Sequence, residues 1–294
     1  MQTINKAVIS CAGFGTRFLP ISKTIQKEML PLFNKPVLDY IVSDCVRAGI
    51  KDIVIVINEH NYQPLHYFRE NQRLASYLAQ MNKSHLYKKV EHIHQQANFS
   101  FIKQTDSHPY GTSIPLILAQ KEIQDEQAFL YLTGDDLVFF ADPNRSFIQE
   151  LINEYQQSAA KAAISGIQVS NQSVSQYGII SHSTENNHCY LKKLIEKPKA
   201  TEAPSNLANI SKYILSPEIL PIIHQQNADK NSGEYFITDA IEQLSHDHKV
   251  LVHQTKGKYL NAGDPVNWLK ANLIVASANP TLKQELQDFI AKEW

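Results

Sequence analysis

The sequence predicts an α/β fold, a doubly wound and mostly parallel sheet with helices on both faces and a helical C-terminal extension. Three observations lead to this fold class. Short β-branched runs alternate with helical patterns through the first half of the chain, further strand patterns follow in the second half, and the tail has a helical pattern. Alternating strands and helices favour a parallel sheet with right-handed crossovers.

The first elements form a β–α–β unit. Residues 7–12 and 52–57 are short apolar runs, typical of buried strands. Between them, residues 36–47 have apolar side chains at a helical spacing, with Pro36 suited to the first turn and Gly49 to the C-terminal cap.

The same alternation continues along the chain. We expect helices at 64–79, 112–121 and 146–157, and strands at 99–103, 128–133, 162–169, 178–182, 190–195 and 207–215. The tail from 264 to 292 has a helical pattern broken at Asn279-Pro280, because a residue before proline disfavours the helical conformation. We divide the chain into a main domain, residues 1–263, and a helical extension, residues 264–294.

Charge and hydropathy exclude two classes of partner. The 294 residues include 28 Lys plus Arg and 29 Asp plus Glu, a formal net charge of −1, whereas nucleic-acid-binding domains have a basic excess. The longest apolar stretches, such as 53–57 and 128–132, are far shorter than the roughly 20 residues of a spanning helix. The N-terminal residues also lack a secretory pattern. We therefore expect a cytoplasmic protein that binds neither nucleic acid nor membrane.

Cysteines and histidines give no metal or disulfide pattern. Cys11, Cys45 and Cys189 lie far apart in the sequence, so we expect them to be reduced and buried. His92 and His94 form a His-x-His pair without a partner set, which is more typical of a polar connecting segment.

The clearest chemical motif follows the first predicted strand. Gly13 and Gly15 lie where backbone amides can turn toward an anion, because glycine has no Cβ. The third glycine of a dinucleotide fingerprint would fall at Phe18, so that motif is absent. An ordinary strand-to-loop turn is the competing interpretation. Arg17 and Lys27 favour a triphosphate site, since positioned cations stabilise charge on phosphoryl oxygens.

Paired carboxylates follow the 128–133 strand. Asp135 and Asp136 come at its carboxyl end, where open α/β sheets bind ligands. Magnesium takes oxygen ligands, usually one or two carboxylates together with substrate phosphates. The sequence therefore indicates a magnesium site in which Asp136 could share the role of Asp135, although paired aspartates also occur in exposed turns.

Several strings occur in the order found in one known family. They are Gly13-x-Gly15-Thr16-Arg17 with Pro20, Lys27-Glu28-Met29-Leu30-Pro31 with Lys35-Pro36, Glu196-Lys197-Pro198-Lys199, residues 203–208 with Tyr213-Ile214-Leu215, and Thr238-Asp239-Ala240-Ile241. With these strings the chain resembles the sugar-1-phosphate nucleotidyltransferases nearly end to end, most closely the bacterial UTP:glucose-1-phosphate uridylyltransferases (UDP-glucose pyrophosphorylases). The resemblance implies a Rossmann-like nucleotidyltransferase sheet that binds nucleotide through about 1–140 and sugar through about 141–263.

The resemblance also implies a reaction. UTP and α-D-glucose 1-phosphate would react with Mg²⁺ to give UDP-glucose and pyrophosphate, in a homodimer or homotetramer, without a covalent intermediate. The implied catalytic residues are Arg17 and Lys27. The implied nucleotide-binding residues are Ala12, Gly13, Gly15, Thr16, Glu28, Gln104 and Gly111. The implied sugar-phosphate-binding residues are Gly178, Glu196 and Lys197, and the implied metal ligands are Asp135 and Asn261.

Three positions depart from the family pattern. Asn261 offers a neutral oxygen where the family has a metal-binding aspartate, although Asp264 could supply the carboxylate instead. Pro109 has no N–H to meet uracil, and residues 109–112 look more like guanylyl and thymidylyl relatives. Gln26 replaces a proline, which predicts a looser loop before Lys27.

These departures leave more than one functional hypothesis. The leading one is an enzyme that makes UDP-glucose. The alternatives are a catalytically weakened homologue that acts as a regulatory or nucleotide-sugar-binding subunit, and an enzyme that prefers dTTP.

Overall fold

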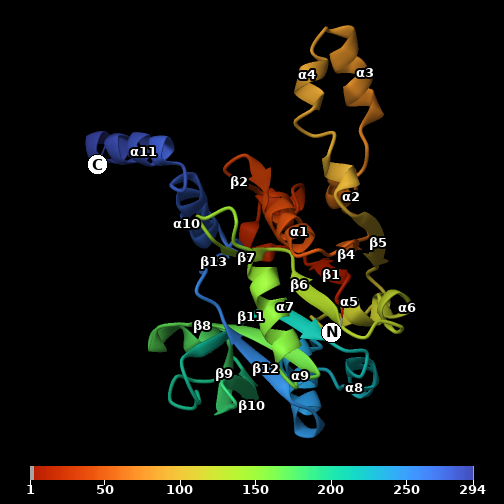
Figure 1. Cartoon of the computed structure of the whole chain (residues 1–294), viewed down its shortest axis with the longest axis vertical. Coiled ribbons are helices and arrows are strands. Elements are labelled where there is room, and N and C mark those ends of the chain that lie inside the picture. Colours follow the sequence, from red (N-terminus) through yellow and green to blue (C-terminus); the bar gives the residue numbers. More distant parts are fainter. Residues whose placement is uncertain (1–2, 294) are drawn as a thin grey trace.

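A nine-stranded mixed sheet organises the chain in the computed structural model, which describes residues 3–293 (Figure 1). The strand order is β5-β4-β1-β6-β11-β8-β12-β10-β9. The strands are β1 (Lys6–Cys11), β4 (Asp52–Asn58), β5 (Asn98–Gln104), β6 (Phe129–Thr133), β8 (Ala162–Gln168), β9 (Gly178–Glu185), β10 (His188–Glu196), β11 (Leu207–Leu215) and β12 (Val250–Gln254). Two small hairpins pair β2 (Pro31–Leu32) with β3 (Lys35–Pro36) and β7 (Asp136–Phe139) with β13 (Lys258–Asn261). Residues 1–2 and 294, the ends of the two predicted segments, lie outside the described residues.

The sheet is parallel only in part. Strands β5, β4, β1 and β6 run parallel, as predicted. The prediction of a mostly parallel sheet is wrong for the other half, where β11 is antiparallel to β6 and β8, and β10 is antiparallel to β9 and β12. Asn186 and Asn187 explain one of these pairings, because their positive φ angles of 50° and 65° make the tight turn of a hairpin between β9 and β10.

Helices cover both faces of the sheet, as predicted. One core cluster joins sheet residues to α1 (Val37–Arg47), α7 (Phe147–Gln157) and α10 (Pro265–Ala276). The other joins them to α5 (Ile114–Leu118), α6 (Gln120–Ile123), α8 (Ile219–Gln225) and α9 (Ile237–Asp247). Successive side chains of β1 point to opposite faces of the sheet, so Ala7 and Ile9 belong to the first cluster and Val8 to the second.

Some elements differ from their predicted form. The 64–79 pattern is two helices, α2 (Gln63–Phe68) and α3 (Gln72–Gln80), which with α4 (Ser84–Tyr87) extend as an arm beyond the sheet (Figure 1). The tail breaks where predicted, between α10 and α11 (Pro280–Glu293). Helices α8 and α9 and strands β7, β12 and β13 were not predicted.

The structure also bears on the predicted burial of the cysteines and on the predicted lack of a membrane-spanning helix. Cys11 and Cys45 are buried, whereas Cys189 is half-buried rather than buried as expected. Within residues 3–293, no helix has the length and apolar character needed to cross a bilayer.

Candidate functional site

The parallel half of the sheet gathers four strand ends at one edge. Strands β1, β4, β5 and β6 end there at Cys11, Asn58, Gln104 and Thr133. The loops after β1, β5 and β6 contain predicted site residues. This is the edge at which open α/β sheets bind ligands.

The glycine-rich loop after β1 passes close to Lys27. Gly15 has φ +63°, a left-handed conformation that precedes the 3-10 helix Thr16–Phe18. A Cβ on Gly13 would lie 3.7 Å from the Lys27 ammonium. The loop therefore presents backbone and cation together, which is the arrangement predicted for a phosphate cradle.

Gln26 anchors the segment before Lys27 through two hydrogen bonds, whereas we predicted that replacing proline here would loosen this loop. Its backbone N–H donates to Gln63 Oε1 at 2.8 Å, and its side-chain amide donates to the carbonyl of Cys11. A proline could make neither bond. The buried Gln26 thus fixes the approach to Lys27.

Lys27 lies between two acidic side chains. Its Nζ is 2.5 Å from Asp135 Oδ2 and 3.7 Å from Glu28 Oε1. Burial alone would lower the pKa of Lys27, but the charges of Asp135 and Glu28 raise it above its usual value. Burial would raise the pKa of Asp135, yet Lys27 holds it below the usual range. Burial raises the pKa of Glu28 to about 7.

Asn261 faces the same point as Asp135. A Cβ on Gly263 would lie 2.9 Å from Asn261 Oδ1 and 3.1 Å from Asp135 Oδ2, with an Arg17 guanidinium nitrogen 3.9 Å away. Asp264 instead caps α10, where its Oδ1 accepts from Asn267 N at 3.0 Å. The structure therefore brings Asn261 to Asp135, while the carboxylate of Asp264 is engaged with the helix.

Asp136 turns to a separate set of partners. It accepts hydrogen bonds from Lys212 Nζ, from Thr133 Oγ1 and, at 2.8 Å, from the hydroxyl of Tyr259. Sequence reasoning missed Lys212 and Tyr259. The available signal was a lysine in the middle of the β11 strand, although that signal does not identify its partner.

A cavity of about 400 Å³ lies beside the glycine-rich loop. It is lined by Ala12, Phe14, Asn58, Gln104, Thr105, Asp106, His108 and Tyr110. Gln104 is buried, and its amide donates to the carbonyl of Pro109 at 3.2 Å. The predicted base-reading glutamine and the departing proline thus contact each other in this pocket.

Gly111 allows the loop after β5 to lie against Tyr235. Its φ is +136°, and a Cβ there would overlap the backbone of Tyr235. Tyr235 N donates to the carbonyl of Tyr110 at 3.0 Å, and Ser113 N donates to the carbonyl of Tyr235 at 2.9 Å. Only glycine satisfies both the conformation and the contact.

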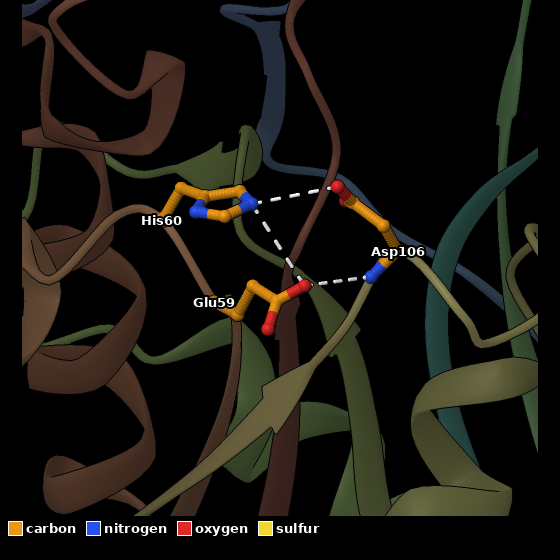
Figure 2. Close-up of side chains that lie close together, drawn as sticks. All are labelled: Glu59, His60 and Asp106. Carbon is orange, nitrogen blue, oxygen red and sulfur yellow. Dashed lines mark hydrogen bonds and ion pairs between the residues drawn. The ribbon is translucent and has the colours of Figure 1, made fainter.

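Glu59, His60 and Asp106 form a cluster beside the pocket that Gln104 lines (Figure 2). Glu59 Oε1 accepts from Asp106 N at 2.8 Å, and His60 Nε2 is 3.4 Å from Asp106 Oδ2. His92 and His94 take no part in it. Because the cluster joins the loops after β4 and β5, its evident role is to hold the pocket wall.

A second pocket, of about 220 Å³, contains the predicted sugar residues. Gly178, Glu196 and Lys197 all line it. Thr238 Oγ1 donates to Glu196 Oε2 at 3.2 Å, and Lys197 Nζ is 3.6 Å from Glu196 Oε1. Burial raises the pKa of Glu196. A Cβ on Gly178 would lie 3.0 Å from Glu196 Oε2, so glycine leaves room at the carboxylate.

Strand β11 supplies further polar groups to this pocket that the sequence did not indicate. Its pairing with β8 is irregular between Asn209 and Tyr213, and Ser211 has φ +53°. Asn209, Ser211 and Tyr213 line the pocket, and Asn209 Nδ2 donates to the Tyr213 hydroxyl at 2.6 Å.

A polar cavity of about 360 Å³ adjoins the second pocket. It is lined by Arg17, Gln176, Tyr177, Lys197, Asn261, Asp264 and Asn267. Gln176, Tyr177 and Lys197 also line the second pocket. Asn261 and Arg17 of this cavity lie near Asp135, which contacts Lys27 beside the glycine-rich loop. Neighbouring contacts therefore connect the second pocket to that loop.

Comparison with known proteins agrees with this arrangement. The family model described as nucleotidyl transferase matches residues 6–277. The chain belongs to this nucleotidyl transferase family.

Individual relatives match over nearly the whole chain. The UTP–glucose-1-phosphate uridylyltransferase of Staphylococcus haemolyticus (strain JCSC1435) is 35% identical over 99% of this chain and 98% of its own length. A UTP-bound UGPase of Acinetobacter baumannii is 30% identical, with a TM-score of 0.85 over 99% of this chain and 100% of its own. A UDP-glucose pyrophosphorylase complexed with UDP-glucose is also 30% identical, with a TM-score of 0.81 over 94% and 100%.

Proposed function

We propose that the chain is a UTP:glucose-1-phosphate uridylyltransferase, which makes UDP-glucose and pyrophosphate from UTP and α-D-glucose 1-phosphate. The observation that carries the proposal is the order in which the groups of the site adjoin one another. The Gln104 pocket is lined by Tyr110, whose hydroxyl lies near Gly13 as the Lys27 ammonium does. Lys27 contacts Asp135, which lies near Asn261, and Asn261 lines the cavity that adjoins the Glu196 pocket. That order matches base, triphosphate and sugar. The relatives with UTP and with UDP-glucose add support.

Lys27 and Arg17 act on the phosphates. An oxygen of the sugar phosphate attacks the α-phosphorus of UTP, and the bond from that phosphorus to the bridging oxygen of the leaving pyrophosphate breaks. Negative charge grows on the phosphate oxygens, so fixed cations stabilise this transition state. The charges of Asp135 and Glu28 hold Lys27 protonated and in place, while the exposed Arg17 lines the cavity of about 360 Å³.

The second pocket orients the sugar. The carboxylate of Glu196 accepts hydrogen bonds from sugar hydroxyls, while Lys197 contacts the sugar phosphate. Lys197 lines both this pocket and the adjoining cavity that contains Arg17, so its ammonium is suited to a phosphate held between them. Gly178 leaves the carboxylate accessible to a ring hydroxyl.

Asp135 and Asn261 fit a magnesium ion by the chemistry of their donor atoms. Both present a side-chain oxygen toward the same point near Gly263, and Mg²⁺ takes oxygen ligands. When bound, the ion would neutralise charge on the triphosphate oxygens. The Lys27 ammonium contacts the same carboxylate at 2.5 Å.

Gln104 reads the base, because an amide pairs with both a donor and an acceptor on the uracil edge. Its amide N–H already contacts the carbonyl of Pro109, so the loop that departs from the family pattern positions the reading group. The two-part main domain, the cytoplasmic location and a homodimer or homotetramer stay predictions.

The test is a pyrophosphate-release assay with UTP, dTTP, ATP and GTP against several sugar 1-phosphates and Mg²⁺. We expect the highest kcat/KM with UTP and glucose 1-phosphate, and a loss of that activity in Lys27→Ala. A preference for dTTP would assign the other nucleotide. Nucleotide-sugar binding without turnover for any pair would identify a non-catalytic homologue and overturn the proposal.

A further inference from the structure

Lys212 is a buried cation beside Asp136. Its side chain on β11 is 3% exposed, and its Nζ contacts Asp136 Oδ1 and lies 3.2 Å from Thr133 Oγ1 and 3.4 Å from the Thr133 carbonyl. β11 pairs with β6, where Lys212 lies opposite Leu132. This register places the ammonium at the end of β6, beside the two aspartates.

The two neighbouring aspartates consequently have different environments. Both oxygens of Asp136 are engaged, one by Lys212 and Thr133 and the other by Tyr259. Asp135 instead turns its Oδ2 to Lys27, close to Asn261. The pairing of β7 with β13 sets Asn261 opposite Asp136, so Asp136 is near the metal position in the backbone although its carboxylate is held elsewhere.

We propose that Lys212 is a positioning residue that withholds Asp136 from the divalent cation and leaves Asp135 as the member of the pair that binds it. The inference rests on the proposed function for its metal. A buried carboxylate without a partner is costly, so its neutralisation by Lys212 holds Asp136 in place. An unpaired Asp136 would attract the nearest cation in competition with Asp135.

Direct metal binding tests this assignment without substrate. We would titrate Mn²⁺, as a spectroscopic probe, into each variant and measure bound ion by electron paramagnetic resonance. Asp135→Asn should lose at least tenfold in Mn²⁺ affinity, whereas Asp136→Asn should stay within about twofold of wild type. Lys212→Met should bind Mn²⁺ at least tenfold more tightly, since it frees a second carboxylate. The double variant Lys212→Met/Asp136→Asn should return to the wild-type affinity.

Two further measurements separate positioning from general stability. Lys212→Arg retains the charge and should keep wild-type Mn²⁺ affinity, and the exposed Lys193→Met serves as the matched control. In the activity assay, Lys212→Met should change kcat and the Mg²⁺ requirement while KM for glucose 1-phosphate stays within twofold. A merely structural role would lower melting temperature without moving metal affinity.

Two outcomes would overturn the proposal. One is an Asp136→Asn variant that loses as much Mn²⁺ affinity as Asp135→Asn, and the other is unchanged affinity in a folded Lys212→Met. If Lys212→Met does not fold, Asp136→Asn still decides, because the proposal requires that Asp136 does not bind the ion. Failure of the proposed function would appear separately, as absent turnover in wild-type protein.

Discussion

Around Lys27, three ionisable side chains are packed at the end of the first strand, with the Lys27 side chain 19% exposed and Glu28 1% exposed. In the sugar pocket, Glu196 and Lys197 lie 3.6 Å apart and the Lys197 side chain is 53% exposed. Both regions carry an acid beside a lysine. They differ in how much water reaches the pair.

The difference in burial has an energetic consequence. Screening by water weakens an exposed pair, whereas a buried cluster keeps most of its electrostatic strength and is costly to leave incomplete. The phosphate end is therefore sensitive to removal of a single charge. The sugar pocket depends more on individual hydrogen bonds, such as that from Thr238 to Glu196, and should tolerate substitution with smaller losses.

The largest expected effect is that of Lys27→Ala. Removing one positioned donor to a transition state costs about 3 to 4 kcal/mol, or roughly 10² to 10³ in kcat. Steady-state kinetics measure the loss, and circular dichroism checks the fold. Lys23→Ala, an exposed lysine on the same loop, is the control and should keep full activity. A decrease in kcat of less than tenfold would remove Lys27 from its assigned role.

Glu28 in the buried cluster around Lys27 should make the stability of the fold depend on pH. Its pKa is raised from 4.5 to about 7, so the folded state binds a proton more tightly than the unfolded state. The stability this gives is present below pH 4.5 and is lost as pH rises through 7, a change of about 3 kcal/mol at 1.36 kcal/mol per pKa unit.

Glu28→Gln removes that pH dependence. Relative to wild type, its melting temperature in EDTA should rise by several degrees between pH 5 and pH 8. The exposed Glu285→Gln should follow wild type at both values. Parallel curves for Glu28→Gln and wild type would show that Glu28 titrates normally.

A smaller effect is expected at Glu196. Glu196→Gln loses a charged acceptor for sugar hydroxyls, so KM for glucose 1-phosphate should rise about tenfold while the dissociation constant of UTP stays constant. Initial rates and calorimetry provide the two numbers. The exposed Glu202→Gln, on the loop that follows, should change neither. If Glu196→Gln weakened UTP binding as much as it raised KM for glucose 1-phosphate, the nucleotide and sugar pockets would not act separately.

Local patterns were enough for much of the fold. The apolar run 207–215 matches β11 at both ends, and the break before Pro280 separates α10 from α11. Helix α8 was not predicted, because it is only seven residues long and contains Pro221. The Asn186-Asn187 turn was a readable signal for the antiparallel hairpin, since asparagine tolerates positive φ.

The candidate site was predictable as a set of positions but not as a set of partners. The motifs identify Lys27, Asp135, Glu196 and Asn261 in the sequence. The structure places Asp135 beside Lys27 and Asn261, and Asn261 and Glu196 line adjoining cavities. The bond from Lys212 to Asp136 spans 76 residues and depends on the register of β11 against β6. A one-residue shift would reverse which face the lysine occupies, so no local pattern could have shown it.

The mildest predicted change is Asn261→Asp, which adds a charge to the buried end. Asn261 Oδ1 accepts from Gly263 N at 2.7 Å, a bond that an aspartate keeps. Because Oδ1 lies near Asp135 Oδ2, the two carboxylates would repel without metal and could share an ion when it is present. The Mg²⁺ concentration for half-maximal activity should therefore fall severalfold, and the melting temperature should fall in EDTA and recover with Mg²⁺.

Asp264→Asn is the matched variant for this test. Asparagine caps a helix about as well as aspartate, so α10 should keep its start and the Mg²⁺ requirement should not change. If Asp264→Asn raises the requirement while Asn261→Asp is silent, Asp264 supplies the second ligand. If neither variant changes the Mg²⁺ requirement, neither residue faces the ion, and Asp135 holds it with substrate phosphates alone. A lowered requirement in Asn261→Asp alone places position 261 at the metal and shows that the native asparagine weakens it.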